Sequence, residues 1–167
     1  MAKRVAYCAM FTALAMIFSY VEAMLPVNFG IPGVKLGIAN TVVLTGLYIL
    51  QWKEVLLISV LRVFLTAILF GNVLSAAYSL AGALCSFVVM LLMKKIGVFS
   101  VTGVSIAGGV SHNMGQLLVA VALVENIRLL FYAPVLLIAG TVTGFLIGIT
   151  VSKIVPVINQ QLTFPRR

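Results

Sequence analysis

The stretch that decides the fold runs from Val101 to Val124 and reads VTGVSIAGGVSHNMGQLLVAVALV. It holds no lysine, arginine or acidic residue. At about 1.5 Å of rise per residue, a helix of this length crosses a hydrocarbon core of about 30 Å. Near its centre lie His112, Asn113 and Gln116. Polar groups at that depth in a membrane are costly and usually functional. The stretch therefore predicts a membrane-spanning helix with a candidate binding site halfway along it.

The composition of the whole chain supports a membrane protein. Of its 167 residues, 63% are apolar and 8% are charged, whereas a soluble domain carries about 25% charged residues. The formal charge of +8 would suggest nucleic acid in a soluble chain. Here the basic residues stand at the ends of apolar stretches, which the membrane explains better. We expect no nucleic-acid partner.

The apolar stretches predict a single all-α membrane domain over residues 1–167, a bundle of six transmembrane helices with both termini cytoplasmic. The predicted spans are 5–25, 35–50, 55–70, 73–93, 101–124 and 129–152. A cleaved signal peptide around Val21-Glu22-Ala23 is disfavoured, because the first stretch is too long and no polar region precedes the site. This topology places two basic residues, Lys35 and Arg128, outside. It places eight inside, as the positive-inside rule requires: Lys3, Arg4, Lys53, Lys94, Lys95, Lys153, Arg166 and Arg167.

Acidic residues are scarce, and this excludes several kinds of chemistry. The sequence has no aspartate, and its three acids are Glu22, Glu54 and Glu125. Aspartate-rich magnesium sites, paired aspartates and aspartate-based triads are therefore not available. Cys8 and Cys85 have no paired spacing and are interpreted as small apolar core residues. We expect no metal site, no cofactor and no catalytic residue.

The candidate site begins with the polar patch of the 101–124 stretch. His112 and Gln116 are four residues apart and share one helical face, with Gly108 one turn earlier. Asn113 lies about 100° round the helix, where it can face a neighbouring helix instead. Two interpretations stay open: a binding or gating role, and an interhelical hydrogen-bond cluster that holds the bundle together.

Arg62 lies near the centre of the predicted span 55–70, at a depth similar to that of His112. None of the three glutamates is placed near mid-depth, so Arg62 is predicted to lack an acidic partner. A buried guanidinium then bonds to backbone or side-chain oxygens, or to an anion. We expect an anionic ligand, a carboxylate or phosphate, that enters from outside, with Asn40, Lys35 and Tyr78 as further contacts. In the alternative, oxygens of the protein itself bond to Arg62, and the residue then stabilises the fold without binding a ligand.

Three other segments have patterns with more than one interpretation. The loop from Pro26 to Gly33 is either a lid over the site or a plain connector. Gly140, Gly144 and Gly148 recur every four residues and predict a close helix contact within the bundle. A stripe of small residues also lies on one face of the first span, and it either packs within the chain or docks a separate membrane subunit. Its members are Ala2, Ala6, Ala9 and Ala13.

With these residues laid out, the sequence resembles the Gx transporter family, which is also called heptaprenyl diphosphate synthase component I. The matching runs are 33–40, Leu61-Arg62-Val63 with Gly71, Ser79 with Gly82, and 108–116. More distantly, the chain is similar to the S components of energy-coupling factor (ECF) transporters. That resemblance implies six membrane helices, a bound vitamin or metal, and an Ala-xxx-Ala docking motif, which Ala9 and Ala13 match. It favours docking for the alanine stripe.

These observations lead to two functional hypotheses. The first is a substrate-binding, S-component-like transporter subunit in a bacterial-type cytoplasmic membrane, partnered by an ECF-type transmembrane subunit and ATPases. No Gly-xxxx-Gly-Lys-Ser/Thr loop is present, so any ATP-driven step needs those other subunits. The second is a non-catalytic membrane partner or scaffold of a prenyl diphosphate, quinone or electron-transfer system. An intramembrane enzyme is a third, weaker alternative, because one histidine and three acids offer little acid-base chemistry.

Overall fold

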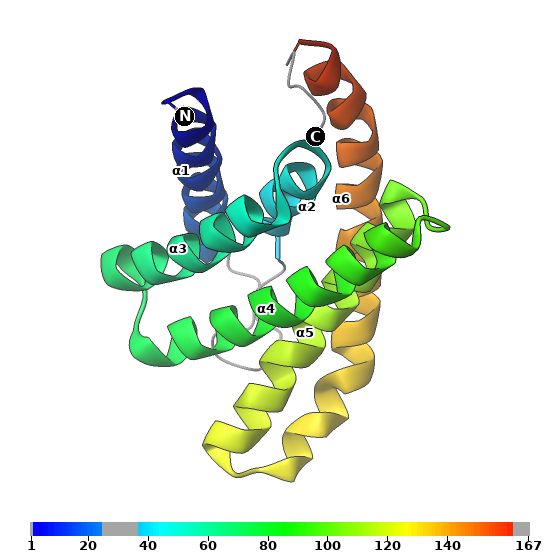
Figure 1. Cartoon of the computed structure of the whole chain (residues 1–167). Helices are drawn as coiled ribbons and strands as arrows, with labels where there is room; N and C mark the ends of the chain where they lie inside the picture. Colours follow the sequence, from blue (N-terminus) through cyan, green and yellow to red (C-terminus); the bar gives the residue numbers. More distant parts are fainter. Residues whose placement is uncertain (1, 25–36, 162–167) are drawn as a thin grey trace.

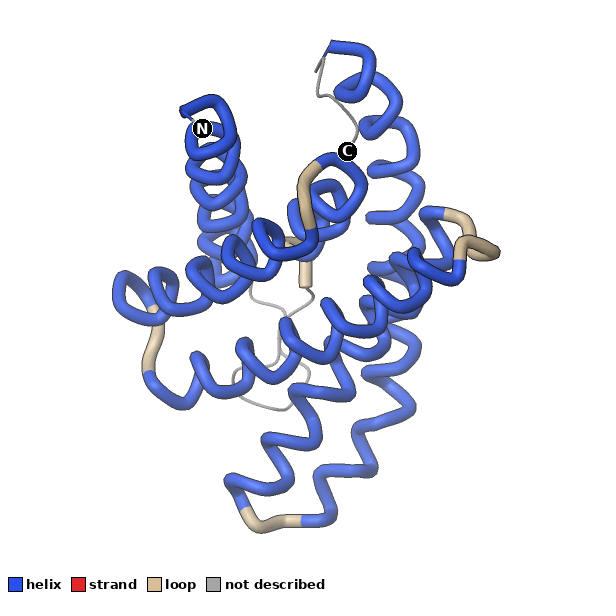
Figure 2. Tube along the Cα trace, viewed as in Figure 1, coloured by secondary structure: helices blue, strands red, loops and turns tan. Residues whose placement is uncertain are grey.

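The computed structural model describes residues 2–24 and 37–161, and these contain helices and no strand. Figure 2 shows short loops between most successive helices. The prediction of an all-α membrane protein is confirmed. The elements are α1 (Ala2–Met24), α2 (Asn40–Ile49), α3 (Trp52–Phe70), α4 (Val73–Ile96), α5 (Val101–Val124), η1 (Ile127–Tyr132) and α6 (Ala133–Gln161).

Four segments of the described chain are long and apolar enough to cross a membrane by length and composition. They are Arg4–Glu22, Val73–Ile96, Val101–Val124 and Ile127–Gln160. The helix α3 is not one of them, because it carries Lys53, Glu54 and Arg62 within 19 residues. Figure 1 places the start of α1 and the end of α6 at the top of the molecule, and the segment between α5 and α6, which holds η1, at the bottom. Six crossings stay a prediction.

The second helix is shorter than predicted. The predicted span covers 35–50, but α2 begins only at Asn40 and has 10 residues, about 15 Å of rise and half of a hydrocarbon core. Gly37 lies three residues before this start and has a left-handed φ of 82°. The Asn40 N–H donates to the Gly37 carbonyl over 2.8 Å and closes a turn there. Residues 25–36 lie outside the described residues, so the predictions for Lys35 and for the loop 26–33 are not tested.

The short helix α2 nevertheless occupies the centre of the core. Seven of its 10 residues are buried, including the polar residues Asn40 and Thr45. Leu44 and Leu47 pack in a cluster with side chains from α3, α4, α5 and α6. Val151 and Val155 of α6 belong to this cluster, and their burial explains why α6 continues to Gln161, beyond the predicted end at 152.

The helices α5 and α6 pack backbone to backbone through glycines. A Cβ atom added to Gly109 would lie 2.4 Å from the Gly140 carbonyl oxygen, and one added to Gly148 would lie 2.6 Å from Thr102 Cα. A Cβ on Gly144 would lie 2.7 Å from Ile106 Cα. Only glycine fits at such distances. The predicted close contact of the glycine repeat within the bundle is confirmed.

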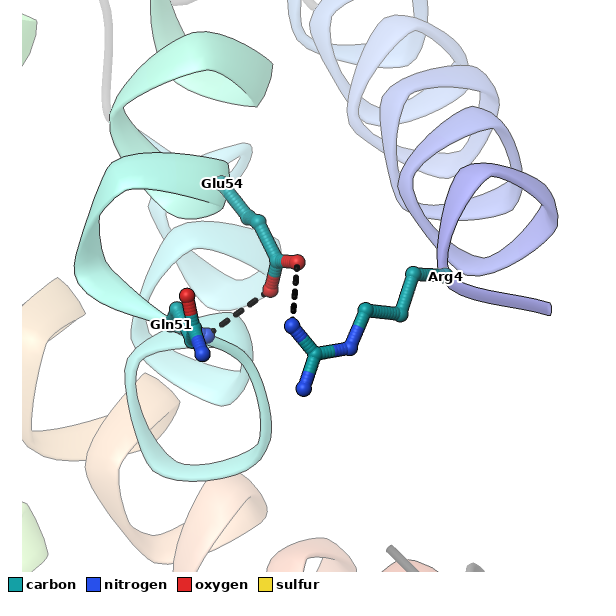
Figure 3. A network of polar contacts seen from close by, with 3 residues as sticks. All are labelled: Arg4, Gln51 and Glu54. Carbon is teal, nitrogen blue, oxygen red and sulfur yellow. Dashed lines mark hydrogen bonds and ion pairs between the residues drawn. The ribbon is translucent and has the colours of Figure 1, made fainter. Parts of the chain in front are cut away.

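Polar contacts join the helix ends on the side of the two termini. Figure 3 shows Glu54 at the start of α3, where it accepts the Gln51 N–H over 2.9 Å and lies 3.9 Å from the Arg4 guanidinium of α1. Lys94, near the end of α4, donates to the Leu47 carbonyl in the last turn of α2. These contacts tie the amino end of α1 to α3 and the end of α4 to α2.

Candidate ligand-binding site

The polar face of α5 packs against a glycine of α4. His112 and Gln116 are 3% and 0% exposed. A Cβ added to Gly82 would lie 2.9 Å from His112 Cε1 and 2.8 Å from Gln116 Cγ. His112 and Gln116 therefore share one face, as their spacing predicts. Gly82 leaves the space that both side chains fill, which explains why a glycine stands in the middle of α4.

On another side His112 lies close to the turn at Gly37 that precedes α2. A Cβ added to Gly37 would lie 3.4 Å from His112 Cδ2 and 3.2 Å from Asn40 Nδ2. The imidazole thus lies close both to Gly82 of α4 and to the turn that opens α2. Two predicted site residues that are 72 positions apart in sequence, Asn40 and His112, meet at one point of the backbone. The turn at Gly37 brings them together.

Arg62 is buried and faces α1. Its side chain is 6% exposed, and Nη1 donates to Ser19 Oγ over 3.2 Å. The prediction that none of the glutamates lies near Arg62 is contradicted by Glu22, although the described residues form no ion pair between the two side chains. Glu22 of α1 is 7% exposed and attracts the positive charge of Arg62. The Glu22 carboxylate also accepts the Gly37 N–H, so it connects Arg62 to the turn beside His112.

The error about Glu22 has a physical cause. Counting residues from the amino end of α1 places Glu22 near the outer membrane surface, away from a residue at mid-depth. The count assumes six parallel, full-length spans. In the structure α2 starts late, so the turn at Gly37 comes down beside Glu22 inside the bundle. Depth in a bundle depends on where each helix begins, and that cannot be read from hydropathy alone.

Several buried polar atoms have no hydrogen-bond partner within the described parts of the chain. They are Asn40 Nδ2, Arg62 Nε, Arg62 Nη2, Thr66 Oγ1, Ser79 Oγ, Ser86 Oγ and Asn113 Oδ1. Each such atom costs about 1–3 kcal/mol if it stays unsatisfied. The nitrogen atoms in this set from Arg62 and Asn40 are all donors. A bound group with oxygen acceptors would satisfy them.

Asn113 and Tyr78 lie away from this group of residues. Asn113 donates to the Leu136 carbonyl of α6 over 2.9 Å, so it does face a neighbouring helix. Tyr78 packs in an apolar cluster with Leu117, Ala120 and Leu136. Of the predicted ligand contacts, Asn40, His112 and Gln116 lie around Gly37 and Gly82. Arg62 is related to them through Glu22, which accepts the Gly37 N–H and whose charge acts on Arg62. Asn113 and Tyr78 pack instead in the region where α4, α5 and α6 meet.

Sequence reasoning missed Ser19, Glu22 and Thr66. Ser19 and Glu22 are three residues apart on the face of α1 that also buries Phe11 and Ala15. An acid on the inward face of an apolar helix is itself a functional signal in a membrane. Thr66 lies one turn after Arg62 on the same face of α3. Helix periodicity therefore indicated that these polar residues face inward, but it did not indicate which residues they contact.

The alanine stripe of α1 lies on the opposite side of that helix. Ala6, Ala9 and Ala13 are exposed, and the side chain of Ala2 lies outside the described residues. Within the described chain α1 contacts only α2 and α3, and Figure 1 shows it at the edge of the molecule. The exposed alanines therefore do not pack against the described part of this chain.

A family comparison covers the buried polar residues of the site, from Ser19 to Gln116, but not Ala2, Ala6 and Ala9. The family described as heptaprenyl diphosphate synthase component I matches residues 11–154 of the chain. The chain belongs to this family. Searches among curated proteins and among solved structures give no match. The family description and the apolar helices together make the chain a membrane component associated with heptaprenyl diphosphate synthesis.

Proposed function

We propose that the chain is the substrate-binding, S-component-like subunit of a transporter for a small anionic molecule, and that the ligand lies between Arg62, Asn40 and His112. The observation that carries the proposal is the set of buried donors without partners. Arg62 Nε, Arg62 Nη2 and Asn40 Nδ2 are held inside the bundle and have no acceptor among the described residues. A ligand carboxylate or phosphate would supply such acceptors.

The start of α2 at Asn40, inside the bundle, supports a binding role. In transporters, substrate sites often lie where a membrane helix is broken, because a half-helix brings backbone groups and its dipole into the bundle interior. Here α2 begins at Asn40, next to His112 and Gly37. The positive end of the α2 dipole therefore points to the same place as the unsatisfied donors. Glu22 balances part of the charge of Arg62, but it leaves two guanidinium nitrogens for a ligand.

Transport would require other subunits, and α1 offers a surface for them. The sequence has no phosphate-binding loop and no aspartate, so this chain would neither hydrolyse ATP nor catalyse prenyl transfer by an aspartate-magnesium mechanism. The exposed alanines of α1 would allow a helix of an ECF-type transmembrane subunit to approach closely. The assembly would lie in a bacterial-type cytoplasmic membrane.

The second candidate is a non-catalytic membrane partner of a prenyl diphosphate or quinone biosynthesis system. The family match favours it, since the family description names a component of a synthase. In that case Arg62 and His112 would stabilise the bundle, and the alanines of α1 would dock an enzyme. The two candidates differ in whether the cluster binds a small molecule.

Native mass spectrometry of the full chain, purified in mild detergent, tests the proposal. We expect a small molecule to stay bound to the wild-type protein and to be lost from Arg62→Gln. The matched control is Arg128→Gln, because Arg128 is exposed in η1 and the substitution removes the same charge. Wild-type protein that stays free of ligand, and that shows no thermal shift with carboxylate or phosphate panels, would exclude the binding role. Co-purification with a synthase in place of a transporter subunit would favour the second candidate.

A further inference from the structure

The position of Glu22 is unusual for a carboxylate. It stands in the last turn of α1, two residues before the helix ends at Met24. The carboxyl end of a helix carries partial negative charge, which disfavours an acid there. Burial of an ionised carboxylate adds a further cost unless partners compensate it. Within the described chain the Glu22 carboxylate accepts the Gly37 N–H and its charge acts on Arg62, and both interactions favour the ionised carboxylate in the core.

The same two partners belong to the proposed ligand site. Gly37 opens the turn that leads to Asn40 and touches His112. Arg62 supplies the positive charge of the site. Glu22 thus offers a carboxylate oxygen to the backbone N–H of Gly37, close to Asn40, whose amide nitrogen has no partner among the described residues. These are the interactions that a ligand carboxylate or phosphate would make.

We propose that Glu22 is an internal substitute for the anionic group of the ligand, and that a ligand carboxylate or phosphate displaces it from the Gly37 N–H and takes its place near the charge of Arg62. This inference rests on the proposed function. An arginine buried with a carboxylate is less costly than an arginine buried alone, so Glu22 stabilises the empty site.

Displacement lowers the apparent affinity of the ligand. The bound state requires the Glu22 contacts to open, and the fraction of protein with these contacts open limits the binding that is measured. Glu22→Gln keeps the size of the side chain and an oxygen that can accept the Gly37 N–H, but it removes the competing charge. The inference therefore predicts that the loss of this acid strengthens the binding of an anion. If Glu22 and Arg62 only stabilise the fold, the Glu22→Gln variant should bind the anion more weakly than wild type or equally tightly.

Isothermal titration of the full chain in detergent with inorganic phosphate and inorganic diphosphate tests this sign. We expect Glu22→Gln to bind the anion about tenfold more tightly than wild type, within the usual range of coupling between sites. The matched control is Glu125→Gln, because Glu125 is an exposed residue after α5 and the change in net charge is identical. It should bind as wild type does. Chloride at equal ionic strength serves as the blank.

A ligand-free measurement keeps the test decisive if a variant folds poorly. In thermal unfolding, Arg62→Gln alone should be more damaging than Arg62→Gln combined with Glu22→Gln, because the single variant leaves a buried carboxylate without its cation. Additive shifts would overturn the inference, because the two residues would then not interact. Coupled shifts with anion binding that depends on Arg62, but is not tightened by Glu22→Gln, would overturn it and leave the proposed function standing. Coupled shifts with no anion binding to either protein would overturn both.

Discussion

The two halves of the molecule are built by different means. In α4, α5 and α6, glycines bring helices into backbone contact, with Gly109 against Gly140 and Gly82 against His112. In α1, α2 and α3, an apolar cluster of Phe11, Ala15, Val42 and Ile58 is accompanied by the buried polar side chains Ser19, Glu22 and Arg62. Close backbone contact cannot adjust without loss of packing, whereas side-chain contacts between helices can open and reform. The comparison suggests a fixed wall that carries His112 and an adjustable wall that carries the charges.

The largest effect is expected where the fixed wall is tightest. Gly109→Ala places a Cβ atom 2.4 Å from the Gly140 carbonyl oxygen, and backbone cannot move away cheaply. We expect a loss of stability of about 2 kcal/mol, measured by thermal unfolding in detergent. Gly103→Ala on the same helix is the control, since its Cβ would have ordinary contacts of 3.5 Å or more. Equal stability of the two variants would contradict a backbone-packed wall.

A smaller effect should separate the two polar amides. Asn113→Leu removes the hydrogen bond to Leu136, and we expect a loss of about 1 kcal/mol with the retention of bound ligand unchanged. Asn40→Leu removes an amide whose nitrogen has no partner among the described residues. It should weaken ligand retention in native mass spectrometry with less effect on the melting temperature. If Asn113→Leu releases the ligand as readily, the site extends into the fixed wall.

The outer face of α1 should tolerate substitution in the isolated chain. Ala9→Leu fills an exposed position, so the stability should change by less than about 0.5 kcal/mol. Recovery of membrane partners in a pull-down should fall, because a leucine prevents close helix approach. Ile17→Ala, at another exposed position of α1, is the control for a general effect of the α1 surface. A large loss of stability in Ala9→Leu would show that the alanines pack within this chain.

The smallest effect is expected at the ion pair between α1 and α3. Arg4 and Glu54 lie 3.9 Å apart with the Arg4 side chain about half exposed. Such pairs contribute about 0.5 kcal/mol or less. Arg4→Gln should therefore shift the melting temperature slightly at low salt and not at high salt, where the charges are screened. A large, salt-independent loss would mean that this contact, rather than Glu22 and Arg62, holds α1 in place.

Much of the fold could be predicted because its signals are local. Apolar length predicted helices, and the four-residue spacing of glycines predicted a close helix contact within the bundle, which the structure shows to be that between α5 and α6. The spacing of His112 and Gln116 predicted their common face. By contrast, the start of α2 was placed too early, because Gly37 stands in an apolar run and its left-handed φ has no hydropathy signal. The acid beside Arg62 was missed for a related reason, since its depth depends on that turn.

By itself, the sequence determined that this is an all-α membrane protein and that Arg62, Asn40 and His112 are costly residues in need of partners. Composition, helix periodicity and the price of polar groups in hydrocarbon act within single segments, so they can be read from one chain. Only the tertiary structure decided that Glu22 lies near Arg62, that the turn at Gly37 places Asn40 close to His112, and that the alanines of α1 face outward. Those facts depend on which helix faces which, and long-range packing sets that arrangement.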